Sequence, residues 1–152
     1  MLIKKLDFEI FADYHQFYLE DETSPHGTDE IWTKETVEKM LGVSEKLVAV
    51  GTARNMTVPV SVEFYDGEPA LELEKYSRVN ECSLKVTSNR LVLLGCTDYY
   101  PDAARIEVEP ATYGVRVLYG NLETVHDLEG EDFYVLQLWK AGEIKPVKTL
   151  KP

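Results

Sequence analysis

Two acidic segments stand out among the residues that could do chemistry. Glu20–Glu30 and Gly120–Asp132 each hold five carboxylates and no Lys or Arg. If both lie at one end of the folded domain, they form a negative rim that attracts a cationic protein surface; a solvated face is the alternative. The acids that we expect to contact a partner are Glu20, Asp21, Glu22, Asp29 and Glu30, with Glu129, Glu131 and Asp132 as a second patch.

Tyr99 and Tyr100 are candidate anchors of the same interface. They follow Asp98 and precede Pro101, within the segment Thr97–Asp102. Tyrosine buries a large area while it keeps a polar tip, so it is frequent at the energetic centre of interfaces. A structural corner, in which the hydroxyl group bonds nearby backbone, explains these two residues equally well. For Tyr14 we favour that structural explanation.

Signatures of catalysis and of cofactor binding are weak. The three histidines, His15, His26 and His126, do not form the close pair that is typical of zinc sites. No phosphate-binding glycine loop and no nucleophile elbow occur. Paired carboxylates of the glycosidase kind can be drawn from the many Glu residues, but the sequence does not show a raised pKa. We predict no catalytic residue, cofactor or metal ligand, and calcium at the acidic segments stays open.

The hydrophobic pattern predicts a mainly β protein, an antiparallel β-sandwich with one short α-helix near residues 33–41. Apolar residues alternate from Leu6 to Ala12, and a bend is expected at Asp13–His15. Thr33 suits a helix N-cap, and Gly42 suits the left-handed position after the helix. Further strands are expected at 47–53, 57–65, 79–87, 90–95, 104–108, 113–119 and 133–139.

Size and charge limit the possible functions. A chain of 152 residues predicts a single domain spanning 1–152. The formal net charge of −11 disfavours direct binding to nucleic acid and to anionic membranes. The N-terminus lacks the apolar stretch of a secretory signal, so we expect a cytoplasmic protein. Cys82 and Cys96 lack metal-site spacing and are expected to be reduced, buried thiols.

Several motifs resemble the competence protein J family. They are Tyr14-His15-Gln16-Phe17, Trp32-Thr33 with Glu35 and Val37-Glu38-Lys39, and Arg54-Asn55, with looser likeness in Cys82–Thr87 and Tyr113–Val117. The likeness covers roughly Leu6 to Trp139, and the distinctive motifs lie in the first 60 residues. The resemblance implies a small bacterial β-sandwich that inhibits a DNA-degrading nuclease in competence. It assigns no inhibitory residue, and the acidic segments leave the identity of the nuclease open.

The leading hypothesis is a non-enzymatic protein that masks a cationic partner, most simply a nuclease whose basic groove would otherwise hold DNA. One alternative is a β-sandwich that binds a small molecule or carbohydrate, including a hydrolase that uses paired carboxylates. Another is a structural homodimer that forms through an edge strand such as the one with Pro59.

Overall fold

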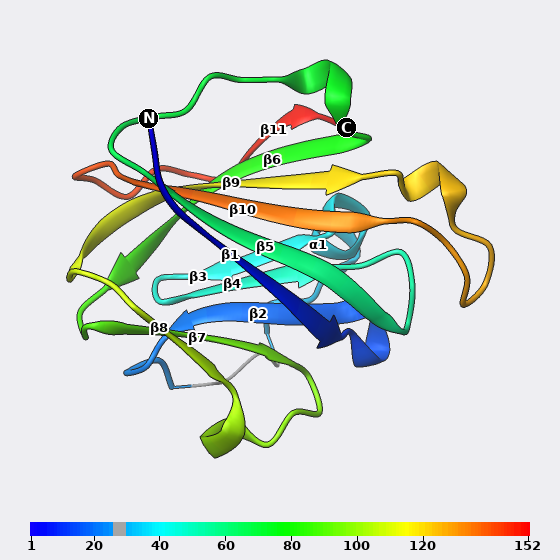
Figure 1. Cartoon of the computed structure of the whole chain (residues 1–152), viewed down its shortest axis with the longest axis horizontal. Coiled ribbons are helices and arrows are strands. Elements are labelled where there is room, and N and C mark those ends of the chain that lie inside the picture. Colours follow the sequence, from blue (N-terminus) through cyan, green and yellow to red (C-terminus); the bar gives the residue numbers. More distant parts are fainter. Residues whose placement is uncertain (26–29) are drawn as a thin grey trace.

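Two β-sheets face each other in the computed structural model, which describes residues 1–25 and 30–152 (Figure 1). Sheet A has the strand order β1-β5-β10-β9-β6-β11, and sheet B has the order β3-β4-β2-β7-β8. The bounds in sheet A are β1 Leu2–Phe11, β5 Thr57–Tyr65, β6 Arg78–Val86, β9 Ala111–Gly120, β10 Phe133–Lys140 and β11 Lys148–Lys151. Those in sheet B are β2 Gln16–Asp21, β3 Leu41–Ser44, β4 Leu47–Gly51, β7 Arg90–Gly95 and β8 Ala104–Glu107. The predicted mainly β sandwich is confirmed.

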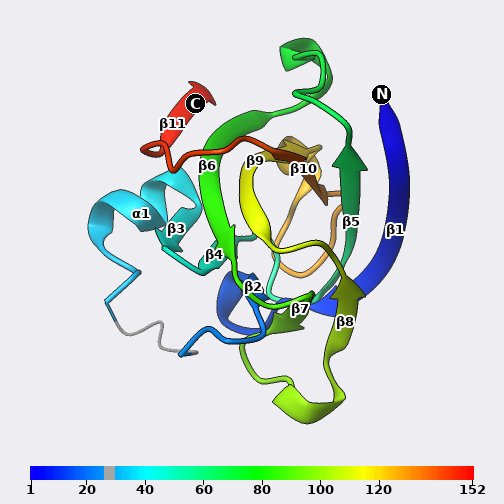
Figure 2. The same ribbon diagram turned by 90° about the vertical axis from the view of Figure 1, so that its left-hand side faces the viewer.

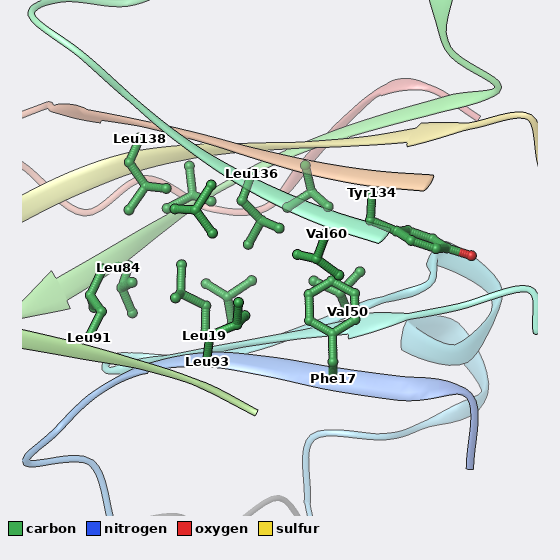
Figure 3. Close-up of a cluster of buried hydrophobic side chains, with 14 of the residues drawn as sticks. Phe17, Leu19, Val50, Val60, Leu84, Leu91, Leu93, Tyr134, Leu136 and Leu138 are labelled. Carbon is green, nitrogen blue, oxygen red and sulfur yellow. The ribbon is translucent and has the colours of Figure 1, made fainter. Parts of the chain in front are cut away.

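The core fills the space between the sheets because apolar residues alternate along most strands. Val60 and Leu136 point down from sheet A toward Leu19 and Phe17 of sheet B (Figure 3). The Tyr134 ring extends sideways and packs edge-on against Phe17, with ring centroids 5.9 Å apart. These side chains are at most 1% exposed. The ribbon turned by 90° shows the two sheets as separate layers (Figure 2). Burial of apolar surface therefore holds the two sheets together.

One strand pair departs from the antiparallel pattern. β10 runs parallel to β5, with Tyr134 opposite Val60 and Leu138 opposite Phe64. β5 therefore lies between β1 and β10 and is not an edge strand, which removes the ground for a homodimer through Pro59. Pro59 is tolerated there because the pairing with β10 begins only at Val60.

The short helix α1 spans Lys34–Lys39 and is capped as predicted at its start. The Thr33 hydroxyl accepts a hydrogen bond from the Thr36 backbone N–H at 3.2 Å, and the Thr36 hydroxyl accepts one from the Thr33 N–H at 2.7 Å. The left-handed residue after the helix is Met40, with φ 60°, and not Gly42. Gly42 belongs to β3, where a Cβ would lie 2.0 Å from Ile31 Cγ2. In the described residues no helix has the length and apolar character that crossing a membrane requires.

Side chains and loops cover the outer faces of both sheets. Ile31, Trp32 and Tyr100 pack on the outer side of sheet B, over Tyr18 and Leu47. Leu73 and Tyr76 pack on the outer side of sheet A, together with Leu150 of β11. Cys82 is buried and Cys96, just past β7, is exposed, so the prediction of a buried thiol was wrong for Cys96.

Candidate partner-binding site

The two acidic segments begin at opposite ends of the sandwich. Asp21 closes β2 beside Lys46 and Ser88, whereas the loop from Gly120 to Asp132 lies beside Arg54, which follows β4 at its far end. Figure 1 shows this loop, between β9 and β10, at the right-hand edge. Trp32 lies at the same end as Arg54, because its indole bonds Gln16 at the start of β2. A single negative rim that includes Glu20 and Asp21 therefore does not form.

Asp21 is a buried structural residue and not part of a loop surface. Its Oδ1 accepts hydrogen bonds from the hydroxyl of Ser88, at 2.5 Å, and from the Ser88 backbone N–H. Its Oδ2 accepts from the hydroxyls of Thr87, at 3.0 Å, and Thr23. Burial raises the pKa of Asp21, but these hydrogen bonds outweigh it and lower the pKa to about 2. The predicted loop start at Glu20 was wrong, because β2 continues through the buried Glu20 to Asp21.

The Asp21→Asn variant should lose about 2 kcal/mol of stability at neutral pH, because the pKa shift favours the ionised folded state by that amount. Because the pKa of Asp21 is lower in the folded state, the ionised carboxylate stabilises the folded protein fully at pH values above the unfolded pKa of 3.8. This stabilisation is lost as the pH falls toward 2. Urea unfolding of both proteins at pH 6 and about pH 2.5 should therefore show a gap that narrows in acid. A difference in unfolding free energy that did not change with pH would contradict a stabilising role for the Asp21 charge. The control is Glu30→Gln, which changes an exposed side chain.

Glu22 and Tyr100 form a half-buried cluster with Arg105. Arg105 Nε lies 3.3 Å from Glu22 Oε2, and the guanidinium stands 4.7 Å above the centre of the Tyr100 ring. Arg105 Nη1 also donates to the backbone oxygens of Tyr100 and Ala103, at 2.7 Å each. This cluster compensates the charge of Glu22 and holds the segment after β2 against sheet B.

Asp132 is fully buried and holds the end of the β9–β10 loop. Its Oδ1 accepts a hydrogen bond from Arg54 Nε at 2.5 Å, and its Oδ2 accepts one from the Tyr134 hydroxyl at 2.6 Å. The Tyr134 oxygen in turn accepts from the Ala53 N–H, and Arg54 Nη1 donates to the Leu128 carbonyl. Asp132 therefore joins two loops internally and is not on the surface where we expected it.

The remaining predicted contact residues differ in their exposure. Glu30, Glu129 and Glu131 are exposed, and Tyr99 is 71% exposed. Asp29 lies outside the described residues. Two of the predicted acids, Glu129 and Glu131, are thus exposed in the β9–β10 loop at the Arg54 end of the sandwich.

The chain passes from sheet A to sheet B at a tight corner, Asp13–His15, where a bend was predicted. Tyr14 and His15 both adopt left-handed backbone, with φ 56° and 60°, which costs free energy in residues that have a Cβ. The Tyr14 N–H donates to Asn55 Oδ1 at 2.8 Å, and His15 Nδ1 lies 3.1 Å from the Thr52 carbonyl oxygen. The backbone of Tyr14 forms a structural corner, and its side chain points outward, 68% exposed.

A chain of polar contacts fixes the surroundings of this corner. Gln16 Oε1 accepts hydrogen bonds from Trp32 Nε1, at 2.8 Å, and from the hydroxyl of Tyr18. Gln16 Nε2 donates to the carbonyl of Tyr14 at 3.2 Å. A cavity of about 520 Å³ opens here, with Tyr14, Trp32 and Val37 in its wall. The corner is thus pre-organised in the free protein.

We call this region the corner surface, defined by Tyr14, His15, Trp32, Val37, Leu128, Glu129 and Glu131. Val37 is 59% exposed and Leu128 is 47% exposed. Arg54 and Asn55 link its two parts, since Asn55 bonds the corner and Arg54 bonds the β9–β10 loop. Exposed aromatic and aliphatic side chains offer contact area, and the neighbouring carboxylates complement a basic patch on a partner protein.

The shifted carboxyl groups give no support to acid catalysis. The pKa values of Asp21, Asp66, Glu109 and Glu123 all move down, whereas a general acid needs a raised pKa. In residues 1–25 and 30–152, no group of three or more His, Cys, Asp or Glu side chains is placed to hold a metal ion. The corner surface itself presents exposed apolar side chains and the carboxylates of Glu129 and Glu131.

Sequence reasoning missed Tyr14, Arg54 and Leu128. A signal for the corner was present, because the motif Tyr14–Phe17 directly follows the expected bend. Arg54 and Asp132 are separated by 78 positions, and nothing in the sequence pairs them. The motifs that resemble the competence protein J family nevertheless meet here, since Tyr14, Trp32 and Asn55 all lie at the corner.

Comparison with known proteins supports this assignment of the fold. No family model matches the chain, and no curated protein matches it. A solved structure described as ComJ, an inhibitor of the DNA-degrading activity of NucA, from Bacillus subtilis, matches with a TM-score of 0.69 at 18% identity. The match covers 93% of this chain and 98% of that one.

A second solved structure, described as crocagin biosynthetic gene J, matches with a TM-score of 0.59 at 16% identity. It covers 90% of this chain and 95% of the other. Both matches therefore run over nearly the whole β-sandwich and not over a fragment. The chain has the fold of ComJ, and this match supports the resemblance to the competence protein J family that its sequence shows.

Proposed function

We propose that this chain is a non-enzymatic inhibitor of a DNA-degrading nuclease and that it covers the basic surface with which the nuclease holds DNA. The observation that carries the proposal is the match in fold to ComJ over 93% of the chain, because ComJ is described as an inhibitor of a nuclease. Inhibition by covering a surface requires no catalytic group, and this agrees with the downward pKa shifts described above.

Electrostatics support a cationic partner. The chain carries a formal charge of −11, and the β9–β10 loop contains no Lys or Arg between Gly120 and Asp132. A basic DNA-binding groove repels other cations and attracts carboxylates in the positions of phosphates. We infer that Glu129 and Glu131 steer the nuclease, with Glu30 and Tyr99 as further contacts and Tyr14 as the apolar anchor.

The function is tested by recovering the partner and measuring its activity. The tagged chain is incubated with an extract of its own cells at low ionic strength, and bound proteins are identified by mass. A recovered nuclease is then purified, and its degradation of duplex DNA is followed as this chain is added. We expect complete inhibition near a one-to-one ratio. A nuclease that degrades DNA at the same rate in tenfold excess of the chain, or recovery of no nuclease, would overturn the proposal.

Reversing the charge of Glu129 and Glu131 to lysine should slow association with that nuclease by about tenfold at low salt and should flatten its salt dependence. Both side chains are exposed, so the fold should be unaffected. Stopped-flow or surface-based kinetics at several salt concentrations measure the effect. The matched control reverses Glu74 and Glu143, which are exposed and lie outside the corner surface. An equal loss in both variants would mean that only net charge matters and would sink the assignment to this loop.

A further inference from the structure

A second cavity, of about 250 Å³, lies on the outer side of sheet A, away from the corner surface. Its wall includes Glu63 and Tyr65 of β5, Gln137 of β10, and Glu72 and Tyr76 of the segment between β5 and β6. The backbone of Pro69 and Ala70 passes along one side. The cavity therefore combines two carboxylates, an amide and two phenol rings.

Gln137 in this wall has an unused acceptor. The side chain is only 9% exposed, and its Nε2 donates to Glu63 Oε1 at 3.1 Å and to the Tyr65 oxygen at 3.3 Å. Its Oε1 is buried and accepts no hydrogen bond within the described residues. A buried amide oxygen without a donor costs free energy, so this position favours a ligand that brings an N–H group.

Glu63 supplies a half-buried negative charge in the same cavity. Its Oε1 accepts from the Tyr65 hydroxyl at 2.7 Å, and no ion pair reaches it from the part of the chain that the structure describes. Lys5 stands opposite Glu63 in the β1–β5 register, but its ammonium lies 3.9 Å from Asp7. Lys75 pairs with Glu72 at 2.6 Å. The charge of Glu63 is thus left for a cation that enters the cavity.

The neighbouring Arg116 does not neutralise Glu63, because its guanidinium is held by other partners. Arg116 lies opposite Gln137 on β9, but its Nε and Nη2 bond Glu81, at 2.8 and 2.7 Å, and its Nη1 donates to the Pro69 carbonyl at 2.8 Å. Arg116 also stands 5.3 Å from the centre of the Trp139 ring. The surroundings of Arg116 show how this face of sheet A holds a guanidinium: a carboxylate, a backbone carbonyl oxygen and an aromatic ring contact it together.

Burial and the nearby carboxylates act in the same direction on the two phenol groups of the cavity. Burial and the hydrogen bond to Glu63 raise the pKa of Tyr65 to about 12. Burial, Glu63 and Glu72 also raise the pKa of Tyr76. Both tyrosines stay neutral at physiological pH, and their rings remain available to a cation.

We propose that this cavity binds a guanidinium group, with Glu63 as its counter-ion and Gln137 Oε1 as a second acceptor. A guanidinium suits the cavity better than an ammonium because it offers several N–H donors in one plane to separate acceptors and stacks on aromatic rings. The group belongs either to an arginine side chain of a protein partner or to a small free cation.

The test uses N-acetyl-arginine-methylamide as the probe and the intact chain, followed by ¹H–¹⁵N NMR. We expect saturable binding with a Kd on the order of millimolar, with shifts centred on Tyr65, Tyr76 and the side-chain amide of Gln137. Glu63→Gln should weaken binding by about tenfold, since a charge-assisted hydrogen bond is lost. Gln137→Leu should weaken it too, and the spectra of both variants report whether the fold persists.

Two controls define the result. The uncharged isostere N-acetyl-citrulline-methylamide should not bind, and Glu74→Gln, at an exposed acid of the same loop outside the cavity, should leave binding unchanged. Equal binding of the citrulline probe, equal binding by Glu63→Gln, or no saturable shift with the arginine probe would overturn the proposal. If Glu63→Gln weakens both probe binding and nuclease inhibition, the guanidinium belongs to the protein partner. If Glu63→Gln weakens probe binding but leaves inhibition unchanged, the cavity holds a free cation. Because the probe assay contains no nuclease, it stands even if the proposed function fails.

Discussion

Replacing Tyr14 with alanine should raise the inhibition constant for the nuclease by about 30-fold, which corresponds to the roughly 2 kcal/mol of an interface hot spot. Tyr14 is the most exposed aromatic residue of the corner surface, and the surrounding backbone already holds it in place. A pre-organised anchor loses little conformational freedom on binding, so its contact area contributes almost fully to affinity. The readout is DNA degradation at increasing concentrations of the variant.

The thermal midpoint of the Tyr14→Ala variant should stay close to that of the wild type, because a side chain 68% exposed contributes little to the core. Ile144→Ala is the control, since Ile144 is 53% exposed and lies beyond the far end of β10. Should the two variants inhibit equally well, the nuclease does not bind at the corner.

Replacing Asp132 with alanine should lower the free energy of unfolding by about 3 kcal/mol, because it leaves Arg54 without its partner in a nearly buried position. The Tyr134 hydroxyl also loses its acceptor. Urea unfolding measures the change. Glu131→Ala, one residue earlier and exposed, should stay within about 0.5 kcal/mol of the wild type.

A double variant, Arg54→Ala with Asp132→Ala, separates charge from packing. If the cost comes from an uncompensated guanidinium, removing it should make the double variant more stable than the sum of the two single changes implies. Simple additivity would show that the two side chains act independently and that the ion pair does not hold the β9–β10 loop.

The elements that could be predicted are those with a local cause. Alternation over Leu6–Ala12 predicted β1, and Thr33 ahead of a run of helix formers predicted α1. β3 was missed, because Leu41–Ser44 continues directly from the helix and Gly42 was interpreted as its end. The strand role of Gly42 depends on the close approach of Ile31, which no local pattern reveals.

The candidate site was harder to predict because burial of charge depends on partners far along the chain. Asp21 has the composition of a solvated loop, yet Thr87 and Ser88 supply its hydrogen bonds from 66 and 67 positions away. Asp132 and Arg54 are related in the same way. Residue type indicated negative charge correctly, but only the fold decides which carboxylates reach solvent.

The parallel pairing of β5 with β10 has a consequence for synthesis of the chain on the ribosome. β5 leaves the ribosome early, but the strand that joins it to β9 comes only at residues 133–140. Until β10 is made, β5 and β9 each lack the strand that pairs with one of their edges, so the backbone N–H and C=O groups of those edges have no partner in the sheet. Nascent chains that end before β10 should therefore be sensitive to proteases and dependent on chaperones. Completion of sheet A should be essentially post-translational.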